Sequence, residues 1–168
     1  RKRFASRSSS QLWFFLSILV SNFNKMNKTT KYILIGLTIW IVMQITRVIA
    51  IPIVQDVLSG TDDAAYLYPA ILDIVVALLS PFAVYLLWKK RTIFSWTAII
   101  AYFVISIIDH GDSVTASLIA RIPQTFQEMG ITNATNTPIF QGIGDIICII
   151  LMCRKDITLL FFDNGKIQ

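Results

Sequence analysis

The sequence predicts an all-α membrane protein with the fold of a four-transmembrane-helix bundle. Hydrophobic residues make up 55% of its 168 residues and charged residues 15%, whereas soluble domains contain about 45 to 50% and about 25%. Its mean hydropathy is +0.64. Four stretches, three of them solidly apolar, lack charged residues and histidine: 32–46, 74–88, 92–108 and 129–144. Such stretches are typical of membrane spans and exclude an ordinary soluble domain.

The first two predicted helices cover about 32–54 and 66–88. The first is about 34 Å long as an α-helix, enough to cross a hydrocarbon core of about 30 Å. The second tolerates Pro69 in its first turn, where the missing N–H is not needed. Pro81 lies in its middle and predicts a kink, because it removes one backbone hydrogen bond.

The third and fourth predicted helices cover about 92–112 and 138–153. Helical character in the third could continue as far as Ala120. The fourth begins at Pro138, a residue favoured at the first helical position, and precedes the cations that start at Arg154. The fourth segment is short for a membrane span.

Basic residues lie near three ends of these helices, and they predict the orientation of the chain. They are Lys25, Lys28, Lys31, Lys89, Lys90, Arg91, Arg154 and Lys155. The excess of positive charge places these ends, and so both termini, on the cytoplasmic side of the cell membrane. Tyr66 is expected at the opposite, outer headgroup level. Because the cations do not share one face, no nucleic-acid partner is predicted.

Residues 1–25 differ from the remainder, 26–168, which is predicted to be a single four-helix transmembrane domain. A basic, Ser-rich, acid-free stretch precedes a short apolar run there. Three interpretations stay open: a targeting segment, an anchor lying in the membrane interface, or leader sequence outside the natural product, because Met26 opens a compact start. A transit peptide would place the protein in an organellar membrane.

Polar and ionisable residues inside the spans are the candidates for function, because such groups are costly in a membrane. The candidates for ligand binding or proton exchange are Gln44, Arg47, Asp73, Asp109, His110, Asp112, Gln141 and Asp145. Arg47 and Asp73 both lie about 24 Å from the inner cations and are expected at one level. Counting from Arg154 places Asp145 about 10 Å closer to the inner surface.

These residues permit a structural and a functional interpretation. In the first, Arg47 and Asp73 form an ion pair that fixes helix register, and 109–112 is a polar helix cap. In the second, they line a cavity open toward the outer side, where Arg47 holds an anionic group and Asp73 or Asp109 exchanges a proton.

The predicted function is that of a small-ligand-binding membrane protein or a subunit of a larger membrane complex. Its predicted partners are the lipid bilayer, other membrane subunits or a second copy. A proton-coupled transporter or channel component is the alternative, and a metal-dependent membrane enzyme is the third hypothesis. His110 with Asp109 is the pair from which a metal site would be built, but the single histidine argues against one. No catalytic residue and no cofactor is predicted.

Overall fold

The structure is a computed structural model that describes residues 26–89, 91–128, 130 and 135–162. The predicted leader, 1–25, lies outside these residues and stays a prediction. The chain divides into two compact units, residues 1–36 and 37–168, and the side-chain contacts described below all lie within the second unit.

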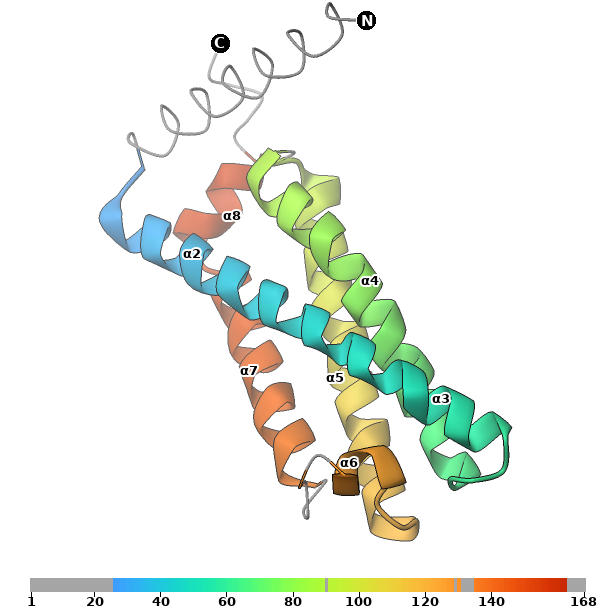
Figure 1. The fold of residues 1–168 in the computed structure, drawn as a ribbon. Coiled ribbons are helices and arrows are strands. Elements are labelled where there is room, and N and C mark those ends of the chain that lie inside the picture. Colours follow the sequence, from blue (N-terminus) through green and yellow to red (C-terminus); the bar gives the residue numbers. More distant parts are fainter. Residues whose placement is uncertain (1–25, 90, 129, 131–134, 163–168) are drawn as a thin grey trace, which may run out of the picture. The chain divides into compact units, whose positions relative to one another are not determined.

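All regular structure in the described residues is helical (Figure 1). The elements are α2 (Lys28–Met43), the 3-10 helix η1 (Gln44–Ile49), α3 (Ala50–Leu58), the 3-10 turn η2 (Ala64–Tyr66), α4 (Leu67–Lys89), α5 (Ile93–Ile119), α6 (Gln124–Glu128), α7 (Asn136–Met152) and α8 (Lys155–Phe162).

Three helical stretches are long and apolar enough to cross a membrane: Lys28–Leu58, Ala64–Lys89 and Ile93–Ile119. Their outward side chains include large hydrophobic residues such as Leu78, which is 70% exposed. This pattern suits contact with lipid and supports the predicted membrane location. The fourth apolar helix, α7, has 17 residues, about 26 Å against a core of about 30 Å. A fourth span therefore stays a prediction.

The structure selects the longer of the two predicted extents of the third helix, which allowed helical character as far as Ala120. α5 does not stop at residue 112 but continues to Ile119, because Asp109 and His110 are buried within the bundle and do not form a polar cap. At its start, the Thr92 hydroxyl accepts the backbone N–H of Ser95, a typical helix cap. α4 is continuous through Pro81.

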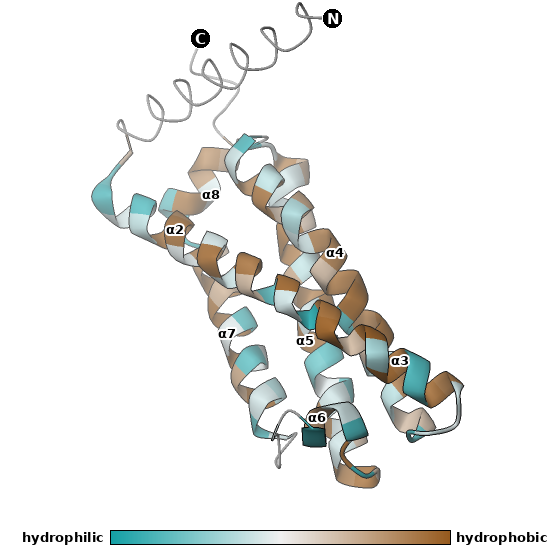
Figure 2. Cartoon of the chain, viewed as in Figure 1, coloured by the Kyte–Doolittle hydropathy of each residue, from teal (hydrophilic) through white to brown (hydrophobic). Residues whose placement is uncertain are grey.

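In the second unit, α5 occupies the central position. α4 packs against one side of α5 and α7 packs against it as well, while η1 and α3 pack against α4. Figure 2 shows hydrophilic residues within the otherwise hydrophobic α5 and α7. Polar groups on neighbouring helices are therefore brought together inside an apolar bundle.

The first long helix changes its winding at η1, where six residues form a 3-10 helix. Such runs rarely exceed three or four residues, and residues three apart lie directly above one another in them. Every third residue here is buried: Ile41, Gln44, Arg47, Ala50 and Ile53. The 3-10 winding thus aligns Gln44 and Arg47 in one row that faces the bundle.

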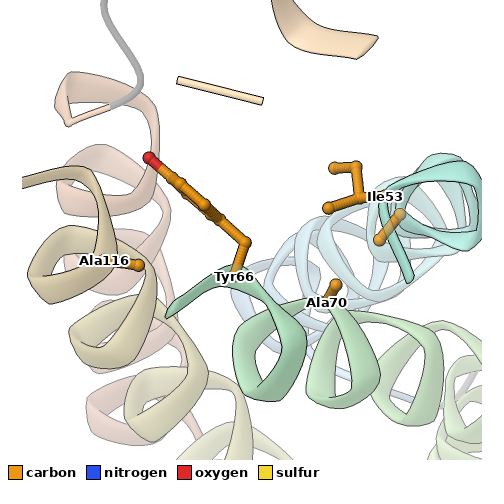
Figure 3. Close-up of a cluster of buried hydrophobic side chains, with 5 residues drawn as sticks. Ile53, Tyr66, Ala70 and Ala116 are labelled. Carbon is orange, nitrogen blue, oxygen red and sulfur yellow. The ribbon is translucent and has the colours of Figure 1, made fainter. Parts of the chain in front are cut away.

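A small apolar cluster lies between this row and the start of α4. It contains Ala50, Ile53, Tyr66, Ala70 and Ala116. Figure 3 shows the ring of Tyr66 extending past Ala116, with its hydroxyl directed away from Ile53 and Ala70. Small residues on three elements make room for this single large ring.

Candidate functional site

Arg47 lies at the centre of a group of polar side chains, here called the Arg47 cluster. Its members are Trp40, Gln44, Arg47, Asp73, Ser106, Asp109, His110 and Asp145. The Arg47 side chain is 4% exposed, and its Nη1 lies 2.6 Å from Asp109 Oδ2 and 3.3 Å from Asp73 Oδ1. Two carboxyl groups from two helices therefore meet at one guanidinium nitrogen.

The other guanidinium nitrogens are also engaged. Nε donates to Gln44 Oε1 at 2.6 Å, one 3-10 turn away, and Nη2 donates to Ser106 Oγ at 2.7 Å. Nη2 also contacts His110 Nε2. Protein groups therefore bond all three nitrogens, while Arg47 also lines the pocket described below. The expectation that Arg47 holds an anionic group stays a prediction.

Asp145 accepts several hydrogen bonds and is fully buried. Its Oδ1 accepts from Trp40 Nε1 at 2.7 Å and from Gln44 Nε2 at 3.3 Å. Its Oδ2 accepts from Ser106 Oγ at 2.5 Å and lies 3.9 Å from Arg47 Nη2. Donors on two other helices thus surround this carboxylate and stabilise its charge.

Side chains from more than one level of the first long helix reach Asp145, because Trp40 and Gln44 lie about two turns and one turn before Arg47, so the depth expected from the count from Arg154 stays a prediction. The Met152 carbonyl at the end of α7 accepts the indole N–H of Trp96 at 2.9 Å. Trp96 lies one turn into α5, so α7 ends deeper in the bundle than α5 begins.

His110 lies between a donor and an acceptor. Its Nε2 contacts Arg47 Nη2 and lies 3.2 Å from Asp145 Oδ2. A neutral ring with an unprotonated Nε2 can accept from Arg47, whereas a protonated ring can donate to Asp145. Whether His110 Nε2 carries a proton, in the neutral or the charged ring, therefore decides which of the two neighbours it bonds.

Asp109 is fully buried, yet only one of its oxygens is bonded. Oδ2 accepts from Arg47, while Oδ1 has no hydrogen-bond partner within the described residues. A buried carboxylate oxygen without a donor is unfavourable. The cluster contains three carboxyl groups, one guanidinium and one imidazole, so with all carboxyls ionised it is negative even when His110 is protonated.

A pocket of about 190 Å³ adjoins the Arg47 cluster. Its polar floor consists of Arg47, Asp73 and His110. Its walls are Thr46, Ile49, Ile53, Tyr66, Pro69, Ala70, Ser113, Phe126, Thr137, Pro138 and Gln141. The Asp73 side chain is 24% exposed, in contrast to the closed environment of Asp109 and Asp145. Asp73 is thus the carboxyl group of the cluster that is accessible from the pocket.

Two predicted site residues lie outside the Arg47 cluster. Gln141 lines the pocket wall. Asp112 is half-buried on α5, and no hydrogen bond or ion pair joins it to the cluster in the part of the chain that is described. In the same residues, no group of three or more His, Cys, Asp or Glu side chains is arranged to hold a metal ion.

Two residues important to the site, Gly144 and Tyr66, were not predicted to belong to it, whereas helical spacing predicts that Trp40 and Ser106 face the bundle interior. Trp40 and Ser106 bond directly to Asp145, and their helical spacing with Gln44 and Asp109 is the sequence signal for them. Gly144 leaves space for the Trp40 ring on α7. Tyr66 lines the pocket and is 5% exposed, although its position at a span end predicts the headgroup level.

Comparison with protein families, with characterised proteins and with solved structures finds no match. The class of protein is therefore defined by the fold and the site: a helical protein of multi-span type with a buried Arg47 cluster.

Proposed function

We propose that this protein binds a small molecule with a cationic group in the pocket that adjoins the Arg47 cluster. The observation that carries the proposal is the position of Asp73. This carboxyl lines the pocket, is 24% exposed, and belongs to a cluster with more carboxyl groups than cations. An ammonium group placed beside Asp73 would offset this excess charge and donate hydrogen bonds to its carboxylate.

The pocket walls support a ligand with an apolar body. Ile49, Ile53, Pro69, Ala70 and Phe126 are all apolar. At about 190 Å³ the pocket is smaller than the roughly 300 to 1,000 Å³ of sites for drug-sized ligands, which favours a small molecule.

One wall residue offers a polar contact for such a ligand. Tyr66 Oη is buried and has no hydrogen-bond partner among the described residues. Buried hydroxyl groups usually find a partner, and this one lines the pocket. A polar group at the outer part of the ligand would satisfy it. On the predicted orientation the pocket opens toward the outer side of the membrane.

Three probes of similar size and different charge test this proposal: butylammonium, butanol and butyrate. We expect butylammonium to bind the purified protein in detergent more tightly than butanol, and butyrate not to bind. Asp73→Asn should weaken butylammonium binding about tenfold to a hundredfold, because a charge-assisted hydrogen bond contributes about 1.5 to 3 kcal/mol. Isothermal titration calorimetry gives the affinities.

Asp112→Asn is the matched control, since it removes a carboxylate from α5 outside the cluster. It should leave butylammonium binding unchanged. Equal binding of butyrate and butylammonium, or full affinity in the Asp73→Asn variant, would contradict the proposal. The predicted contacts with other membrane subunits or a second copy are separate proposals, and this measurement does not depend on them.

A further inference from the structure

We infer that the carboxyl groups of Asp73 and Asp109 together hold one proton in the ligand-free protein, and that this proton exchanges with water through the pocket. The inference goes beyond the proposed function and does not depend on the nature of the ligand. It starts from the juxtaposition of Asp73 Oδ1 and Asp109 Oδ2, which lie 3.3 Å and 2.6 Å from the same Arg47 nitrogen.

A single guanidinium nitrogen does not compensate two carboxylates in a buried site. Two carboxylates that share one site repel each other, and one proton shared between them removes the repulsion. Asp109 Oδ1 is buried and has no donor within the described residues. Protonation of this pair therefore removes one buried negative charge. It does so where the carboxylates have the fewest hydrogen-bond donors and positive charges beside them.

The third carboxyl of the cluster is a less suitable proton acceptor. Asp145 receives hydrogen bonds from Trp40, Gln44 and Ser106. These three donors hydrogen-bond both of its oxygens, whereas Asp109 Oδ1 has no donor within the described residues. The contrast between Asp145 and Asp109 assigns the proton to the pair at Arg47 Nη1.

Every neighbouring element contributes charged or titratable groups near this pair. Some of these groups face the pair directly, and the others lie within one helical turn of a residue that does. Together they are Arg47 on η1, Tyr66 on η2, Asp73 on α4, Tyr102, Asp109, His110 and Asp112 on α5, and Asp145 and Cys148 on α7. Arg47 is the permanent cation in this set. Protonation of His110 supplies a second positive charge. His110 Nε2 then donates to Asp145, at 3.2 Å, so Arg47 remains the cation that contacts Asp73 and Asp109.

The route of exchange follows from exposure. Asp73 is 24% exposed and lines the pocket, whereas Asp109 is fully buried. A proton from pocket water binds an oxygen of Asp73, forming one O–H bond, and can pass to Asp109 as that bond breaks and a new O–H bond forms. The proton reaches Asp109 without opening the helix bundle.

Infrared spectroscopy of the ligand-free protein in detergent and potassium buffer tests this inference. At pH 7, exposed aspartates and glutamates are ionised, because their ordinary pKa values are near 4. We expect the carbonyl stretching band of one protonated carboxylic acid, which shifts in heavy water. Asp73→Asn and Asp109→Asn should each abolish the band, since the remaining carboxylate then has Arg47 to itself.

Asp156→Asn, which removes a partly exposed carboxylate of α8 outside the Arg47 cluster, is the control and should keep the full band. Asp73→Asn carries the test if Asp109→Asn fails to accumulate, because the Asp73 side chain is only partly buried. Two results would overturn the inference: no band in the wild type at pH 7, or a band that persists in Asp73→Asn.

This test is separate from the test of the proposed function. The infrared band is measured without ligand and depends only on the charge of the cluster. If butylammonium does not bind, the infrared band of the ligand-free protein is still expected. If the infrared band is absent, butylammonium can still bind to an ionised Asp73. The two outcomes are therefore distinguishable.

Discussion

Replacing Gly144 with alanine is expected to destabilise the protein by about 2 to 4 kcal/mol, because overpacking and the loss of a hydrogen bond to a charged group act together. The Trp40 ring lies directly against Gly144. A Cβ at this position would overlap ring atoms of Trp40, with Cε2 at 2.9 Å. The ring must move, and Trp40 Nε1 then loses its 2.7 Å hydrogen bond to Asp145 Oδ1.

Unfolding by sodium dodecyl sulfate from mixed micelles, followed by circular dichroism, measures this effect. Gly142→Ala on the same helix is the matched control, because its Cβ would meet the nearest atom, His110 Cβ, at 3.6 Å, an ordinary contact. Trp40→Leu should relieve the clash, so the Gly144→Ala/Trp40→Leu double variant should lose less than the sum of the single losses. Equal stability of Gly144→Ala and Gly142→Ala would contradict the close packing of Trp40.

Arg47→Met is expected to cost about 3 to 5 kcal/mol, the usual effect of removing one partner of a buried ion pair. The substitution leaves Asp73, Asp109 and Asp145 without their permanent cation. Arg47→Lys should recover only part of the loss, because an ammonium group cannot reach Gln44, Asp109 and Ser106 together.

The exposed ion pair of Arg154 and Asp156 provides the comparison for Arg47→Met. Its side chains are 46% and 31% exposed, and such pairs contribute about 0 to 1 kcal/mol. Arg154→Met should therefore change the unfolding midpoint only slightly in the same detergent titration. Adding Asp109→Asn to Arg47→Met should restore stability, since it removes a buried charge. If Arg47→Met and Arg154→Met lose the same stability, the Arg47 cluster is not an electrostatic centre of the fold.

Much of the secondary structure could be predicted from hydropathy, because apolar stretches long enough to cross a bilayer have few alternatives to a helix. Each end of the predicted range 66–88 lies within one residue of the corresponding end of α4, when η2 is not counted as part of that helix. Each end of the predicted range 138–153 lies within two residues of the corresponding end of α7. The end of α5 was left open between residue 112 and Ala120 because the polar residues 109–112 resemble a helix cap. Their burial between helices depends on packing that a single sequence does not display.

Most of the Arg47 cluster could be inferred in the same way, since six of its eight members were predicted site candidates. Burial costs single out Arg47, Asp73 and Asp109, and the structure places all three together. The contact of Asp145 with Arg47 was not predicted from the count of residues, because such a count does not show how far long side chains reach between levels. Gly144 was missed because it matters only through the space that it leaves for the Trp40 ring on another helix. The sequence alone does not show which residues of two helices lie opposite each other.

Because η1 is wound as a 3-10 helix, a change in its winding would alter both the length of the first long helix and the direction of its side chains. A residue advances about 2.0 Å in a 3-10 helix and about 1.5 Å in an α-helix, so rewinding these six residues as an α-helix would shorten the helix by about 3 Å. The same change would turn Arg47 by about 60° relative to Gln44. A change of pitch alone, without a loop or a domain movement, would thus withdraw the guanidinium from its carboxyl partners and draw α3 toward α2.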